Sequence, residues 1–229
     1  MKKPKGQATR PLLVIFCEGE LTEPSWLASV GRHLGNRALD IRPGPGVPLT
    51  LVRRAMDEVR QIRREGRSDE AEVWCIFDVD EHPGLAEARH LAATHGIQLA
   101  ISNPCFELWL LLHFRDQPGM QHRDAVARML REFQPAYAKQ PDFGLLGPLL
   151  PVAIARARRL SEDAASMDEA GRNPTTDVYR LVERIEHPRP TVLSTAPATI
   201  PDPAVGRLGD PTPPEGVKPK VRHRPRNPS

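Results

Sequence analysis

Two short, uninterrupted apolar runs constrain the fold of this chain more than any other feature. They cover residues 12–17 and 73–77 and are rich in valine, isoleucine, phenylalanine and tryptophan. Such runs are typical of strands buried on both faces of a sheet. A helical pattern follows each run, at residues 24–34 and 85–95. This order predicts an α/β fold with a parallel sheet flanked by helices.

Acidic residues come directly after both apolar runs. Glu18 follows the first run, and Asp78 and Asp80 follow the second. Ligands of open parallel sheets bind in the crevice beyond the carboxyl ends of the strands, so we expect these three acids to face that crevice. Mg²⁺ is usually held by one or two protein carboxylates together with waters and phosphate oxygens. The pattern therefore predicts a site for Mg²⁺ or Mn²⁺, in which Glu18 binds a second ion or moves protons.

Two more residues are candidates for catalysis. His82 lies two residues after Asp80, and its ordinary pKa near neutrality suits proton transfer, although it could equally be a polar loop residue. Glu107 lies in the first turn of an almost wholly apolar helical segment, where burying an acid without a partner is costly. We expect a metal, an arginine or the helix dipole to be that partner. Glu23 is interpreted mainly as an acid that favours the start of a helix.

The remaining pattern completes the predicted domain organisation. Further strands are expected at residues 39–42 and 97–102, and Asn103-Pro104 and Asn173-Pro174 look like helix starts. Residues 1–10 are predicted to be a flexible basic arm, residues 11–187 one α/β domain with a helical C-terminal half, and residues 188–229 a proline-rich, basic, disordered tail. The additional helices are predicted at residues 49–65, 104–114, 123–133, 151–167 and 175–185, with an irregular stretch at 134–148.

Charge and composition leave a nucleic-acid partner open. The formal net charge is +3, which permits such a partner without requiring one. The polar face of the helix predicted at 49–65 carries Arg53, Arg60 and Arg64, which could follow a nucleic-acid backbone or simply be solvated. The longest apolar stretch is far shorter than the roughly 20 residues of a membrane span, and no leader pattern is apparent. We therefore expect a cytoplasmic protein without a membrane partner, and three reduced cysteines.

Four ordered motifs resemble the RloB-like family, which is associated with prokaryotic restriction and abortive-infection loci. They are VIFCEGELTEP, CIFDVDEHP, NPCFELWLLLHF and NPTTDVYRLVE, and the resemblance covers residues 12–183. The fold of that family is similar to the Toprim domain. The resemblance implies a Rossmann-like Toprim sheet in which Glu18 matches the Toprim glutamate, and Asp78 and Asp80 match the metal-binding pair.

The resemblance also implies an activity. It points to a metal-dependent nuclease of antiphage defence that acts on nucleic acid, with RNA such as transfer RNA favoured over DNA. Lys139, in a segment YAKQ that resembles a family-typical stretch, could bind a phosphate or simply be a solvated lysine. A partner protein or an activating signal of a defence system, and self-association into a homo-oligomer, are further expectations.

Two other functions remain open. A phosphatase with an aspartyl nucleophile would also use an acidic strand end and magnesium, but position 82 is histidine where the common DxDxT motif has threonine. A non-catalytic module could use the same fold to bind nucleic acid, a nucleotide signal or a partner subunit. Direct cleavage and binding measurements separate these alternatives.

Overall fold

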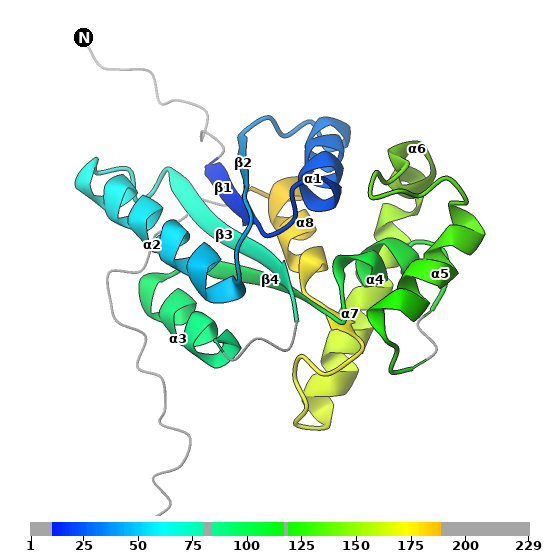
Figure 1. The fold of residues 1–229 in the computed structure, drawn as a ribbon. Coiled ribbons are helices and arrows are strands. Elements are labelled where there is room, and N and C mark those ends of the chain that lie inside the picture. Colours follow the sequence, from blue (N-terminus) through cyan, green and yellow to red (C-terminus); the bar gives the residue numbers. More distant parts are fainter. Residues whose placement is uncertain (1–10, 80–83, 117–118, 189–229) are drawn as a thin grey trace, which may run out of the picture. The chain divides into compact units, whose positions relative to one another are not determined.

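The computed structural model describes residues 11–79, 84–116 and 119–188. Within these residues the chain forms a five-stranded sheet in the order β2-β1-β3-β4-β5 (Figure 1). The first four strands of this order are parallel, and β5 is antiparallel to β4. The predicted parallel α/β sheet is therefore confirmed, with one short strand added at its edge. The strands are β1 (Leu12–Cys17), β2 (Leu39–Pro43), β3 (Ala71–Asp78), β4 (Gln98–Asn103) and β5 (Thr175–Thr176).

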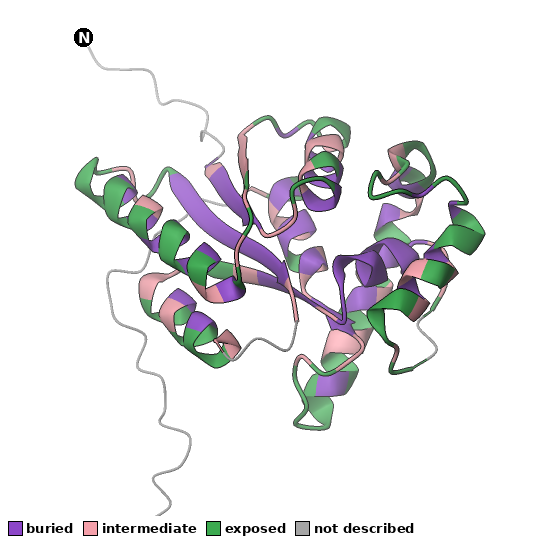
Figure 2. Ribbon diagram, viewed as in Figure 1, coloured by how far each residue is buried: buried purple, intermediate pink, exposed green. Residues whose placement is uncertain are grey.

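The central strands are buried on both faces, as their continuous apolar sequences predict. In β1, Leu13 and Ile15 belong to one hydrophobic cluster, whereas Val14 and Phe16 belong to another on the opposite face. Figure 2 shows β1 and β3 buried along nearly their whole length. Successive side chains of a strand point to opposite faces, so a run without polar residues can fill both clusters.

Helices cover both faces of the sheet. On one face, α2 (Pro48–Arg64) and α3 (Leu85–His95) pack against the strands. On the other face, α1 (Thr22–His33) and α8 (Val178–Glu186) pack against them, and the same cluster continues into a helical part of the chain. That helical part comprises α4 (Phe106–Leu111), α5 (Arg123–Phe133), α6 (Phe143–Leu146), the 3₁₀ turn Gly147–Leu149 and α7 (Leu150–Ser166).

The strand order reverses between β1 and β3. The chain passes from β1 to β2 on one side of β1, and then returns to place β3 on its other side. The helices that follow β1 and β3, which are α1 and α3, consequently lie on opposite faces of the sheet. Such a reversal opens a crevice at the carboxyl ends of the two strands, which is where ligands bind in sheets of this kind.

Both Asn-Pro sequences differ from the prediction of helix starts. The helix predicted from residue 104 begins at Phe106, and the helix predicted from residue 175 begins at Val178, after β5. Asn103 Nδ2 donates a hydrogen bond to the Gly171 carbonyl (2.9 Å) instead of capping a helix. The asparagine side chains bind distant backbone, and a local pattern cannot show such contacts. The stretch predicted to be irregular, 134–148, contains α6 and most of the 3₁₀ turn.

Three smaller expectations concern membranes, cysteines and termini. No helix within the described residues is long and apolar enough to cross a membrane. Cys17, Cys75 and Cys105 are buried and free, as expected, and burial raises the pKa of each thiol. The predicted basic arm and residues 189–229 of the predicted tail lie outside the described residues.

Candidate active site

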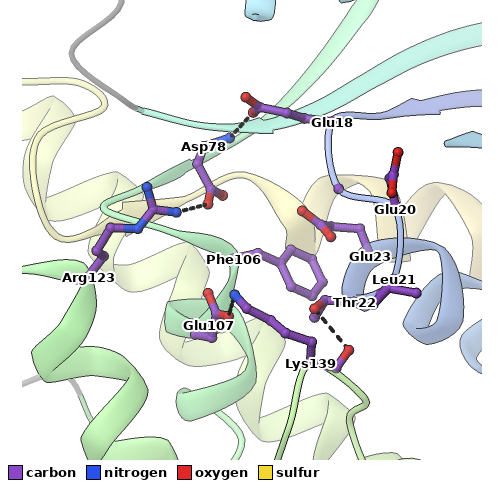
Figure 3. Close-up of a pocket in the computed structure, with 11 residues that line it drawn as sticks. Glu18, Glu20, Leu21, Thr22, Glu23, Asp78, Phe106, Glu107, Arg123 and Lys139 are labelled. Carbon is purple, nitrogen blue, oxygen red and sulfur yellow. Dashed lines mark hydrogen bonds and ion pairs between the residues drawn. The ribbon is translucent and has the colours of Figure 1, made fainter. Parts of the chain in front are cut away.

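A pocket of about 380 Å³ lies at the carboxyl ends of β1 and β3, where the strand order reverses (Figure 3). Its wall combines residues from the sheet, from the start of α1 and from the helical part of the chain. The lining contains five acidic and two basic residues. It consists of Glu18, Gly19, Glu20, Leu21, Thr22, Glu23, Asp78, Phe106, Glu107, Arg123 and Lys139.

The two strand-end acids lie side by side in this pocket. The Glu18 backbone N–H donates to the Ile76 carbonyl (3.1 Å), which extends the pairing of β1 and β3 by one residue. Glu18 Oε2 then accepts a hydrogen bond from the Asp78 backbone N–H (3.2 Å). The parallel register of the two strands therefore sets the position of both carboxylates. Asp80 and His82, the other candidates of this segment, lie outside the described residues, and their roles stay predictions.

Asp78 faces a cation that the sequence analysis missed. Arg123, at the start of α5, lies with Nη2 3.3 Å from Asp78 Oδ2. Burial raises the pKa of Asp78, the charges of Glu23 and Glu107 raise it further, and Arg123 opposes them. No local signal identifies Arg123, because 45 residues separate it from Asp78.

Glu107 is buried beside Asp78 in the first turn of α4, and its partners are a tyrosine and a lysine. Tyr137 Oη donates to Glu107 Oε1 (3.0 Å), and Lys139 Nζ donates to the same oxygen (2.5 Å). The expected metal, arginine or helix dipole is thus not needed to explain its burial. Burial alone would raise the pKa of Glu107, but these contacts and the charge of Lys139 lower it overall. The carboxylate is therefore ionised near neutrality.

Lys139 reaches the pocket from a loop that is fastened to α1. Its backbone has a positive φ of 65°, and its carbonyl accepts a hydrogen bond from Thr22 Oγ1 (3.0 Å). The side chain is 61% exposed, although its Nζ touches the buried Glu107. Lys139 therefore presents a fixed positive charge that is accessible from solvent.

Glu23 contributes a further carboxylate to the pocket as well as an acid to the first turn of α1. A Cβ added at Gly19 would lie 2.0 Å from Glu23 Oε2, so a larger residue at position 19 would displace this carboxylate. Burial raises the pKa of Glu23, and the charge of Glu107 adds to the rise. Its place in the sequence favours the helix role, and the structure places the residue in the pocket too.

A comparison with protein-family profiles matches residues 13–185 to the family described as RloB-like protein. The chain belongs to the RloB-like family. The match begins in β1 and ends in α8, so it includes every residue of the pocket and all of the sheet except Leu12. Comparison with curated proteins and with solved structures gave no match.

The arginines proposed to bind nucleic acid lie elsewhere in this RloB-like protein. Arg53, Arg60 and Arg64 are all on α2, and none of them lines the pocket. Arg53 pairs with Glu87 of α3 (3.2 Å), and Arg60 pairs with Asp57 of its own helix (2.7 Å). The fold does not bring these three residues to Glu18 and Asp78, and their binding role stays a prediction.

The pocket of this RloB-like protein fits a hard divalent cation by the chemistry of its donors. Five carboxylates, those of Glu18, Glu20, Glu23, Asp78 and Glu107, line it together with two cationic side chains. Within the described ranges, no three His, Cys, Asp or Glu side chains form a ready-made metal cage. Mg²⁺ needs only one or two protein carboxylates and completes its shell with water and phosphate oxygens. An added cation would also offset the excess negative charge of the lining.

Proposed function

We propose that this RloB-like protein is a metal-dependent nuclease of the Toprim type. It would cleave phosphodiester bonds of nucleic acid, with RNA such as transfer RNA favoured, during abortive infection. The observation that carries the proposal is the pairing of Glu18 with Asp78 at the switch point between β1 and β3. Carboxylates in that crevice suit a phosphate ligand only if a cation accompanies it. The association of the family with restriction loci supports the defence role.

Glu18 and Asp78 would hold Mg²⁺ or Mn²⁺, together with Asp80 two residues further along the chain. When bound, such an ion neutralises charge on the phosphate and lowers the pKa of a bound water. The raised pKa of Glu23 implies that its carboxyl group releases a proton as a cation binds. Cation binding should therefore strengthen with increasing pH.

Lys139 would bind a phosphate oxygen of the substrate, and Glu107 would hold the lysine side chain in place. The ammonium group is exposed at the pocket, whereas Glu107 is buried beneath it and accepts hydrogen bonds from Lys139 and Tyr137. Because contacts lower the pKa of Glu107, its carboxyl group carries no proton to donate near neutrality. Glu107, a catalytic candidate from the sequence, is thus better suited to positioning Lys139 than to giving up a proton.

The decisive experiment incubates the full chain with transfer RNA, other RNA, and single- or double-stranded DNA in Mg²⁺ or Mn²⁺. Asp78→Ala and Glu18→Gln variants are compared with Glu132→Gln, which removes an exposed carboxylate of α5. We expect cleavage to fall at least about 100-fold in the two pocket variants and to persist in the control. Circular dichroism confirms that each variant is folded.

Cleavage that survives Asp78→Ala would contradict the proposal. Binding of nucleic acid without cleavage under every metal condition would replace the nuclease with a binding module. Release of inorganic phosphate from small phosphate esters would instead favour the phosphatase.

A further inference from the structure

Arg123 is the pocket residue whose role is least explained by the proposed chemistry. Its guanidinium lies 3.3 Å from Asp78 Oδ2, and its side chain is 43% exposed whereas that of Asp78 is 13% exposed. The arginine therefore covers a buried carboxylate from the solvent side (Figure 3). A divalent cation bound by Asp78 would need the same carboxylate that Arg123 now neutralises.

Side chains that are distant from Arg123 in the sequence hold the segment just before it in place. Just before α5, the backbone of Gln121 is held at both of its polar groups by Asn173: Gln121 N–H donates to Asn173 Oδ1 (3.2 Å), and Asn173 Nδ2 donates to the Gln121 carbonyl (2.7 Å). Asn103 in turn donates to the Gly171 carbonyl (2.9 Å). The start of α5 is thereby fixed to the end of β4, and β4 pairs with β3 at Asp78.

The two cations of the pocket differ in what they neutralise. Lys139 contacts Glu107, which is not among the proposed metal ligands, so a metal ion would not compete with it. Arg123 contacts Asp78, which is among them, so Arg123 and a bound cation would repel each other at one carboxylate. The guanidinium of an arginine carries N–H donors in a fork that matches phosphate oxygens.

We propose that Arg123 is a counter-ion that changes partners. In the metal-free protein it neutralises Asp78; when a divalent cation takes Asp78, the guanidinium turns to a non-bridging phosphate oxygen of the nucleic acid. The inference rests on the proposed metal and phosphate chemistry of the site. It makes Arg123 a substrate-binding residue, and Asn173 a positioning residue that acts through the start of α5.

The test measures metal binding and nucleic-acid binding separately on the full chain. Arg123→Gln is compared with Arg128→Gln, which removes an exposed arginine of the same helix for which the described part of the chain provides no ion pair. Mn²⁺ binding is followed by electron paramagnetic resonance without nucleic acid. Binding of labelled transfer RNA is followed by fluorescence anisotropy with Ca²⁺ in place of Mg²⁺.

The expected signature is a pair of opposite shifts. Arg123→Gln should bind Mn²⁺ about fivefold more tightly, because a positive charge next to Asp78 is gone. It should bind transfer RNA about tenfold more weakly, because a charge-assisted hydrogen bond is lost. Arg128→Gln should change neither constant. Asn173→Ala, which keeps the guanidinium but loosens its support, should shift both constants in the same directions by smaller factors.

A merely structural role for Arg123 would weaken both kinds of binding and would overturn the inference. Unchanged Mn²⁺ binding in Arg123→Gln would overturn it as well, even if metal-dependent cleavage proves the nuclease. Opposite shifts in a protein that cleaves no polymer would support the change of partners and contradict only the nuclease. A wild-type protein that binds no Mn²⁺ would end both proposals.

Discussion

Strand β3 carries an acid near each end, and the two acids have contrasting surroundings. Glu72, near the amino end, accepts hydrogen bonds from Trp74 Nε1 and Arg184 Nε, both at 2.7 Å, and the Glu72 and Arg184 side chains are largely buried. The carboxylate of Asp78, at the carboxyl end, lies at a longer distance of 3.3 Å from the half-exposed Arg123. A buried charge satisfied inside the protein stabilises one fold, whereas a buried charge neutralised from the solvent side can exchange its partner for a ligand.

The contrast follows from where the sheet leaves space. At the amino end, α8 places Arg184 directly against the strand, and Asn36 also binds the carbonyl of Ile185 in that helix (2.9 Å). At the carboxyl end, the reversal of strand order prevents a helix from closing the crevice between β1 and β3. The following predictions test this division between a structural end and a functional end.

The largest effect is expected at the structural end. Glu72→Gln removes the charge that faces Arg184 and should lower the free energy of unfolding by about 3 kcal/mol, since breaking a buried ion pair leaves an uncompensated charge. Urea denaturation at neutral pH measures the change. Glu132→Gln, an exposed site, should stay within about 0.5 kcal/mol of the wild type. A loss below about 1 kcal/mol for Glu72→Gln would erase the contrast between the two ends.

Asp78→Asn should increase the stability of the protein, in contrast to Glu72→Gln, and the size of the increase should depend on pH. The pKa of Asp78 is higher in the folded protein than in the unfolded chain. At pH values between these two pKa values, the folded state therefore holds more protons than the unfolded state. Stability of the wild type should then fall as pH increases through the folded pKa, and the asparagine variant should lack this loss. Denaturation at pH 5, 6.5 and 8 in a chelator checks this. Parallel curves for the two proteins would show that Asp78 is not destabilised by its surroundings.

Glu107→Gln should reduce cleavage about tenfold, because Lys139 loses its charged anchor. The reduction should appear as weaker substrate binding, with the pH profile of kcat/KM unchanged in shape. Steady-state kinetics from pH 5 to 9 provide the comparison. Loss of one limb of the profile would instead assign Glu107 an acid–base role.

The smallest effect is expected from Gly19→Ala. The added methyl group would meet the Glu23 carboxylate at 2.0 Å and push it aside, weakening Mn²⁺ binding a few-fold. In a background that already carries Glu23→Ala, the same change at Gly19 should have little effect. Isothermal titration calorimetry of Mn²⁺ binding to the wild type, the two single variants and the double variant measures the coupling between Gly19 and Glu23. Equal effects in both backgrounds would mean that Gly19 serves the turn itself.

The sequence was sufficient for those parts of the site that depend on neighbours along the chain. The apolar runs of β1 and β3 predict buried parallel strands, and that fold places Glu18 and Asp78 at one edge. Partners from distant segments could not be predicted in the same way. Arg123 meets Asp78 across 45 residues, and Lys139 meets Glu107 across 32, so only the tertiary packing of these segments brings them together.

The Asn-Pro sequences show why a local signal can mislead. An asparagine before a proline is a good helix start by its own chemistry, yet the amides of Asn103 and Asn173 bind the backbone of Gly171 and Gln121. Tertiary hydrogen bonds replaced the local ones, and β5 formed where a helix was expected.

The burial of the cysteines makes the native chain a convenient background for site-directed labelling. All three of its cysteines are enclosed, and their raised pKa values keep the thiols protonated and slow to react with alkylating reagents. Met120, three residues before Arg123, is 79% exposed. A Met120→Cys substitution would therefore supply one fast-reacting handle beside the pocket, from which a spin label or fluorophore could follow the start of α5 as metal and nucleic acid bind.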